Sequence, residues 1–256
     1  MKASTHSKVA TVLRDFAVGQ LPKLTKWSVA DIRRAYPFHR LFFPDEAILA
    51  ARVERSVVTV MGASLYPQLA TTIALDKHRD VHANYSIAGT LNDAACNMIE
   101  QIVTELRTPP RRRTTPRTPD HAAEVRDILG SHGGGSTTRT VTADLFVGDF
   151  AGGPLFIELK TPLPNLDIAA ESKRKMLYFL AIMERQGVPN ARAYLGLTYN
   201  PFLTRAAYGH SFTRQIMDMD AQVLLGQELW DHIGGDGTYD ELLAIIEEVK
   251  DSLPHF

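Results

Sequence analysis

Two strands, a helix and a third strand follow one another in the second half of this chain, and their order most constrains the fold. Residues 137–147 are rich in β-branched side chains and residues 154–160 are apolar, so both segments predict strands joined by a short Gly-Gly turn. Residues 167–186 predict a helix, and 193–198 a third strand. A strand–helix–strand order predicts a parallel crossover pair. We therefore expect an α/β protein with a small mixed β-sheet flanked by helices.

The remaining segments predict mainly helices, because their apolar residues recur at three- and four-residue spacing. The segment 45–76 predicts one long helix or a pair of helices, because Gly62 and Pro67 are expected to break or kink it. The predicted helices span residues 8–20, 45–76, 91–106, 120–130, 211–228 and 238–251.

The length of 256 residues predicts one or two domains, and we expect a single domain over residues 1–256. Its parts are a mainly helical region (1–106), a basic connection rich in proline and glycine (107–136) and a core (137–256). No apolar run approaches about 20 residues, so no transmembrane helix is expected. No signal peptide is evident, and the single cysteine, Cys96, has no partner for an internal disulfide. These features favour a cytoplasmic protein.

The charged residues Asp144, Glu158 and Lys160 lie in the predicted strands. Side chains two residues apart lie on the same side of a strand, so Glu158 and Lys160 point together while Leu159 points into the core. Ionised groups in such an apolar run are costly unless something stabilises them. Two carboxylates beside a lysine can hold Mg²⁺ near a phosphate, and the lysine can position or deprotonate water or stabilise developing charge. The alternative is a surface ion pair.

Asp144, the thirteen residues after it, and Glu158-Leu159-Lys160 resemble the PD-(D/E)XK motif of nucleases. A longer match is similar to the TdeIII-type type II restriction endonucleases. Its segments are residues 53–56, 158–165, 170–175 and 228–239. This sequence departs from the motif in one place, because Ala143 rather than proline precedes Asp144.

This resemblance implies a restriction-endonuclease-like core with additional N- and C-terminal helices. It also implies a homodimer that hydrolyses double-stranded DNA at a short palindromic site, GGNCC in TdeIII-type enzymes, with Mg²⁺ and no nucleotide cofactor. Asp144 and Glu158 would ligate Mg²⁺ together with the Leu159 carbonyl, and Lys160 would be the catalytic lysine. Glu54 matches a helix glutamate that completes the metal environment in many such nucleases; its alternative is an ordinary helix-surface charge.

The resemblance also implies residues that contact DNA. A polar group next to the active site would face the DNA backbone, since phosphate contacts position a protein on DNA. This group comprises Asn165, Lys173, Arg174 and Lys175. The basic run could instead be an ordinary helix face that pairs Glu171 with Lys175.

A proline-rich stretch at residues 107–117 holds five arginines and no acidic residue. Arginine is the expected reader of guanine in a G-rich site. We therefore name Arg111, Arg112 and Arg113 as candidate base-reading residues. The alternative is a solvated linker.

Other motifs in the chain support other activities poorly. His78 and His82 have a metal-like spacing but lack the glutamate of a zinc protease helix, and no P-loop pattern is present. Three alternatives to a restriction enzyme remain. They are a PD-(D/E)XK nuclease of DNA repair or recombination, a non-catalytic DNA-binding protein on the same fold, and a helical interaction protein.

Overall fold

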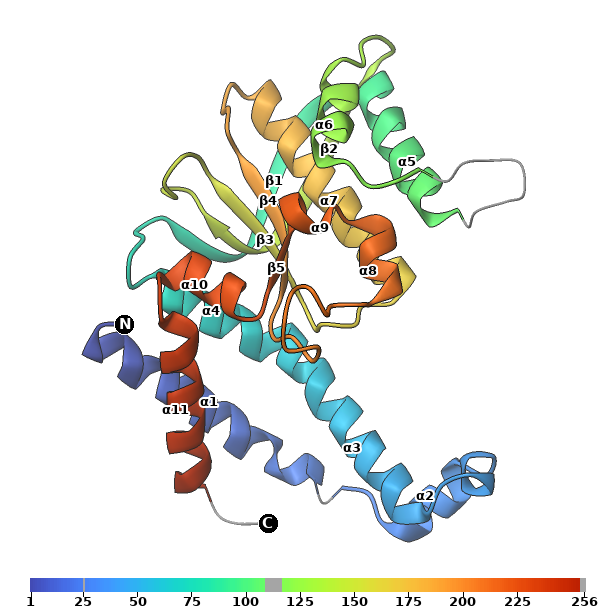
Figure 1. The fold of residues 1–256 in the computed structure, drawn as a ribbon, viewed down its shortest axis with the longest axis vertical. Coiled ribbons are helices and arrows are strands. Elements are labelled where there is room, and N and C mark those ends of the chain that lie inside the picture. The colour runs from blue at the N-terminus through green and yellow to red at the C-terminus, as the bar shows by residue number, and fades with distance from the viewer. Residues whose placement is uncertain (25, 109–116, 254–256) are drawn as a thin grey trace.

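The computed structural model describes residues 1–24, 26–108 and 117–253 of the chain. A five-stranded sheet lies between two layers of helices (Figure 1). Its strands follow the order β1-β2-β3-β4-β5, with antiparallel pairing from β1 to β3 and parallel pairing from β3 to β5. The strands are β1 (Val81–Asn92), β2 (Ser136–Val147), β3 (Leu155–Lys160), β4 (Arg192–Leu197) and β5 (Val223–Leu225). The predicted α/β class with a mixed sheet flanked by helices is confirmed.

Each helical layer packs on its own hydrophobic core. One core joins the sheet to α5, α7 and α8, and the other joins it to α1, α4, α10 and α11. The α-helices are α1 (Ala3–Leu24), α2 (Val29–Ala35), α3 (Asp45–Val60), α4 (Tyr66–Ala74), α5 (Asp93–Arg107), α6 (His121–Leu129), α7 (Leu166–Arg185), α8 (Ser211–Ile216), α9 (Met219–Gln222), α10 (Gln227–Gly234) and α11 (Thr238–Ser252). A short 3₁₀ turn, η1 (His39–Leu41), follows α2.

The crossover between β3 and β4 follows the prediction. Asn165 caps the first turn of α7, because its Oδ1 accepts a hydrogen bond from the Ile168 backbone N–H at 2.9 Å. The helix then crosses the sheet with Leu177, Phe179 and Ile182 fully buried. It returns the chain to β4, which pairs in parallel with β3.

Two strands were not predicted. The segment 81–92 forms β1, in which residues 82–86 are exposed on both faces, so it lacks the alternation that marks a half-buried strand. The segment 211–228 was predicted as one helix, but β5 interrupts it and pairs with β4. Gly226 ends β5 with φ of 51°, a conformation that glycine adopts readily.

The helix predicted at 45–76 consists of α3 and α4 joined by a π-helical turn, η2 (Met61–Leu65). The turn contains Gly62, and Pro67 lies in the first turn of α4, so the regular α-helix is interrupted where the sequence predicted it, although the chain stays helical. Asp45–Ala74 is also long and apolar enough to span a membrane by length and composition alone. We assign it to the globular fold, because α4 packs in the core and α3 lines the pocket described next.

Candidate active site

Strands β2 and β3 bring the three predicted catalytic residues together. The Lys160 Nζ lies 3.0 Å from Asp144 Oδ2 and 2.7 Å from Glu158 Oε1. The Leu159 backbone N–H also donates to Asp144 Oδ2 at 2.8 Å. Asp144 and Glu158 therefore approach the same ammonium group, although they lie on neighbouring strands.

Burial determines the electrostatics of this group. The Glu158 side chain is only 2% exposed, whereas Asp144 and Lys160 are 22% and 26% exposed. Burial alone would lower the pKa of Lys160, but the carboxylates of Glu158 and Asp144 raise that pKa above its ordinary value. The lysine is thus held in its charged form by the two acids.

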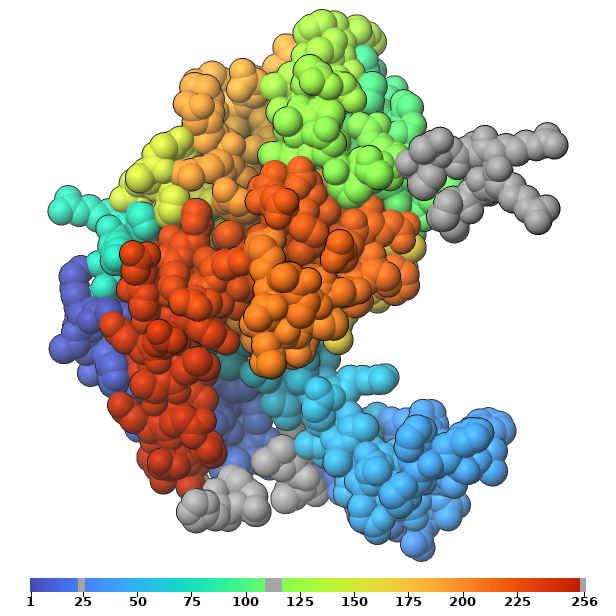
Figure 2. Space-filling view, viewed as in Figure 1, coloured from blue at the N-terminus to red at the C-terminus, as the bar shows by residue number. Residues whose placement is uncertain are grey.

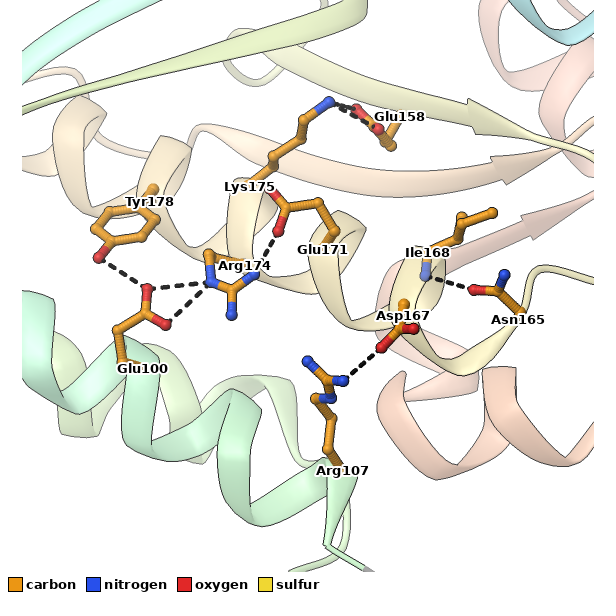
Figure 3. Close-up of polar contacts among 10 residues, drawn as sticks. All are labelled: Glu100, Arg107, Glu158, Asn165, Asp167, Ile168, Glu171, Arg174, Lys175 and Tyr178. Carbon is orange, nitrogen blue, oxygen red and sulfur yellow. Dashed lines mark hydrogen bonds and ion pairs between the residues drawn. The ribbon is translucent and has the colours of Figure 1, made fainter.

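A second lysine contacts the buried glutamate (Figure 3). Lys175 extends from α7 and its Nζ donates to Glu158 Oε1 at 2.9 Å and to Oε2 at 3.0 Å. Lys175 was expected to face the DNA backbone; in the structure its ammonium lies at the Glu158 carboxylate. From the sequence, Lys175 could be placed only on the basic face of a helix. The position at which α7 crosses β3, beside Glu158, is not contained in that spacing.

The site opens into a pocket of about 590 Å³ between α3 and the sheet. Asp144, Leu159 and Lys160 line it from the sheet, and Glu54 lines it from α3. The π-helical turn contributes Gly62 to the same wall. Such turns are frequent at functional sites. Glu54 therefore lies in the same pocket as Asp144 and Lys160, a position that a glutamate on an ordinary helix surface need not have.

Three oxygen atoms converge where a cation could bind. Lys160 Nζ lies within 3.0 Å of Asp144 Oδ2, Glu158 Oε1 and the Leu159 carbonyl oxygen. The ammonium occupies a position surrounded by the oxygen ligands that Mg²⁺ prefers, so the donor set fits this ion. Within residues 1–24, 26–108 and 117–253, no cluster of three or more Asp, Glu, His or Cys side chains is arranged to hold a metal. Glu54 lines the pocket without joining such a cluster.

Lys173 lies in the core rather than on the surface where a contact with the DNA backbone was predicted. Its side chain is fully buried and pairs with Glu124 of α6 and Gln222 of α9. Burial lowers the pKa of Lys173 and raises that of Glu124, so each is shifted toward its neutral form. Lys173 and Lys175 lie two positions apart on α7, so their side chains leave different sides of the helix. Lys173 points into the core, and Lys175 points toward Glu158.

The other predicted DNA contacts have structural partners (Figure 3). Arg174 donates to Glu100 of α5 at 3.0 Å and also pairs with Glu171. Asn165 is exposed at the start of α7 and holds the helix cap described above. Arg111, Arg112 and Arg113 lie outside the described residues.

The comparisons with known proteins identify the family. A family model described as "Type II restriction endonuclease, HinfI" matches residues 1–250, and the chain belongs to this family. It is an enzyme of the type II site-specific deoxyribonuclease class. The resemblance noted in the sequence is confirmed at the level of type II restriction endonucleases, whereas the TdeIII type stays a prediction.

Curated relatives carry the same description. Type II restriction enzyme HgiEI of Herpetosiphon aurantiacus is 33% identical over 230 residues, which cover 90% of this chain and 80% of the relative. Type II restriction enzyme HgiBI of the same organism is 32% identical over 83% of this chain and 76% of the relative. Type II restriction enzyme MjaII of Methanocaldococcus jannaschii is 25% identical over 75% of this chain and 52% of the relative. No solved structure matches the chain significantly.

Proposed function

We propose that this restriction endonuclease uses Mg²⁺ to hydrolyse both strands of duplex DNA at a short palindromic site. The observation that carries the proposal is the convergence of Asp144, Glu158 and the Leu159 carbonyl on one cation position beside Lys160. The pocket between α3 and the sheet gives the phosphodiester backbone access to these groups. The TdeIII-type resemblance favours GGNCC as the site, and we expect the enzyme to act in the cytoplasm.

In the proposed reaction, Asp144, Glu158 and the Leu159 carbonyl hold the metal, and Glu54 extends the acidic wall of the pocket. Bound Mg²⁺ would supply a Lewis acid that lowers the pKa of a coordinated water and neutralises charge on the phosphate. Lys160 would leave its position among the oxygens and orient the attacking water or stabilise charge on the phosphate. Lys175 would keep Glu158 oriented by its two hydrogen bonds.

A digest of unmethylated plasmid tests this proposal directly. Purified enzyme with Mg²⁺ is expected to give discrete fragments whose sequenced ends share one palindrome, and EDTA is expected to prevent cleavage. A smear would instead indicate a nuclease of repair or recombination. Intact plasmid in both Mg²⁺ and Mn²⁺, despite tight DNA binding, would indicate a non-catalytic role and contradict the proposal.

Substitution of the metal-holding acids tests the site itself. Asp144→Ala and Glu158→Ala are each expected to lower the cleavage rate by about 100-fold or more while DNA binding persists. Glu247→Ala is the matched control, because Glu247 is exposed on α11 and pairs only with Lys250 among the described residues. Cleavage by Asp144→Ala at the normal rate would remove this assignment.

A further inference from the structure

Asn84 interrupts strand β1 at the position opposite Asp144. The pairing of β1 with β2 runs through Ala83↔Leu145 and resumes at Tyr85↔Ala143, so the intervening pair would be Asn84 and Asp144. That pair is missing from the ladder, and Asn84 has φ of 50°. A non-glycine residue with positive φ inside a strand is uncommon, and asparagine is among the few that tolerate it.

At Asp144, the side chains of β2 also change the face of the sheet toward which they point. Val141 and Ala143 pack in the core beneath α5 and α7, and so does Phe146, three residues further on. Leu145 and Val147 pack in the opposite core. Regular alternation would put Ala143 and Leu145 on one face, so the alternation is reset at Asp144. Both strands are therefore distorted at the position where the Asp144 carboxylate points toward the pocket.

The Asn84 side chain is free to meet a ligand. It is exposed, and it lines the same pocket as Asp144, Lys160 and Glu54. Among the residues that the structure describes, none forms a hydrogen bond with its amide. Unfavourable backbone conformations that serve no internal contact are concentrated at functional sites.

We propose that Asn84 contacts the substrate, its side-chain amide donating a hydrogen bond to a phosphate oxygen of the DNA backbone beside the scissile bond. This inference rests on the proposed nuclease function and adds a residue to that site. A neutral amide suits the position, because it can donate to an anionic phosphate next to Asp144 without adding negative charge. The strained backbone then serves to direct both Asn84 and Asp144 into one pocket.

Three substitutions separate the amide from the backbone conformation. Asn84→Gly removes the amide but adopts positive φ readily, so the fold and melting temperature are expected to be maintained. Asn84→Asp keeps the shape and replaces the donor by a carboxylate. Asn84→Ala removes the amide and disfavours the conformation. Asn190→Gly is the matched control, because Asn190 also has positive φ, at 63°, but lies in the α7–β4 connection outside the pocket.

We expect Asn84→Gly to cleave plasmid about 10- to 100-fold more slowly than the unmodified enzyme, the effect of one hydrogen bond to a charged group. Asn84→Asp should lose at least as much, because its carboxylate repels phosphate, and Asn190→Gly should cleave normally. If Asn84→Gly cleaves at the normal rate, the backbone conformation alone matters and the proposal is overturned.

DNA binding distinguishes this inference from the proposed function. A gel-shift titration of linearised plasmid at low salt, with Ca²⁺ in place of Mg²⁺, is expected to show weaker binding by Asn84→Gly, which removes only the amide, than by Asn190→Gly. If the unmodified enzyme cuts no DNA, the proposed function fails and this titration alone decides the role of Asn84. Equal binding by the two variants would then overturn it.

Discussion

Glu158 is a buried carboxylate with two lysines around it. Lys160 contacts it from the same strand and Lys175 from the helix that crosses above. A buried charge is tolerated when it is paired and hydrogen-bonded, and here both oxygens of the carboxylate are engaged. This arrangement holds the Glu158 carboxylate, the proposed metal ligand, in one orientation.

Substitution of Lys175 tests that orienting role. Lys175→Met is expected to raise the Mg²⁺ concentration needed for half-maximal cleavage by about tenfold, because loss of a group that orients a ligand weakens metal sites by this order. Lys175→Arg, which keeps the charge and two donors, should recover part of the loss. A Mg²⁺ titration of cleavage rate is the measurement. An unchanged titration curve for Lys175→Met would contradict the assignment.

The residues of the candidate site differ in how far their positions could be predicted. Glu158 and Lys160 could be predicted to act together, because alternation along a strand is a local property. Asp144 could be assigned to the same site from its spacing to Glu158 and from the family resemblance. The contact of Lys175 with Glu158 could not be predicted, because it depends on where α7 packs across β3.

Helix α7 is also held by a buried ion pair that the active site does not use. Lys173 pairs with Glu124 and thereby joins α7 to α6, while Gln222 extends the contact to α9. Removal of one partner leaves the other charge buried and unpaired, which is strongly destabilising. A hydrophobic pair of similar volume avoids that penalty.

We expect Lys173→Met to lower the free energy of unfolding by about 3 to 5 kcal/mol. The double variant Lys173→Met, Glu124→Leu should recover most of this loss, because no uncompensated charge remains. Urea unfolding at neutral pH measures both. If Lys173 contacted DNA instead, the single variant would unfold normally and lose DNA affinity, which would contradict its burial.

Arg205, in the connection between β4 and α8, forms an ion pair with Glu228 in the first turn of α10. Burial raises the pKa of Glu228, but hydrogen bonds from Arg205 and the Leu225 backbone N–H outweigh it and leave the pKa below its ordinary value of 4.5. A carboxyl group with a lowered folded-state pKa stabilises the protein above its unfolded pKa. This stabilisation is lost as the pH falls through the folded-state pKa.

Glu228→Gln is therefore expected to melt at a lower temperature than the unmodified enzyme at pH 7. The difference should shrink as the pH falls below the ordinary glutamate pKa of 4.5 and through the lower folded-state pKa of Glu228. Thermal melts across this pH range check the expectation. A constant difference at every pH would show that the charge of Glu228 does not contribute.

The molecule as a whole is hollowed on the side of its N-terminal helices. Figure 2 shows α2 and α3 projecting away from the body, with a recess between α3 and the segments that cover the sheet. The pocket that contains Asp144 and Lys160 lies between α3 and the sheet. We therefore expect DNA to approach along α3.

Each chain contributes one set of Asp144, Glu158 and Lys160. Two such sets are needed to cut both strands of a palindrome at once. We predict a homodimer, because a two-fold symmetric site is matched by a two-fold symmetric protein. Light scattering after gel filtration should give twice the 28.4 kDa of one chain. A single-chain mass both free and bound to DNA would contradict this prediction.

The local sequence determined the strand–helix–strand core and the pairing of Glu158 with Lys160. Both follow from the periodicity of apolar and charged residues over a few positions, and this periodicity is already present in the unfolded chain. The break of the 45–76 helix was also predictable, because glycine and proline act on their own backbone.

Only the tertiary structure decided the partners of residues that are distant in sequence. β1 is a strand because β2 lies beside it, and β5 because β4 does. Lys173 is buried and Lys175 reaches the active site although they lie two residues apart on one helix. Asn84 enters the pocket because its strand pairs with the one that carries Asp144. Such contacts depend on packing between segments, which no local pattern encodes.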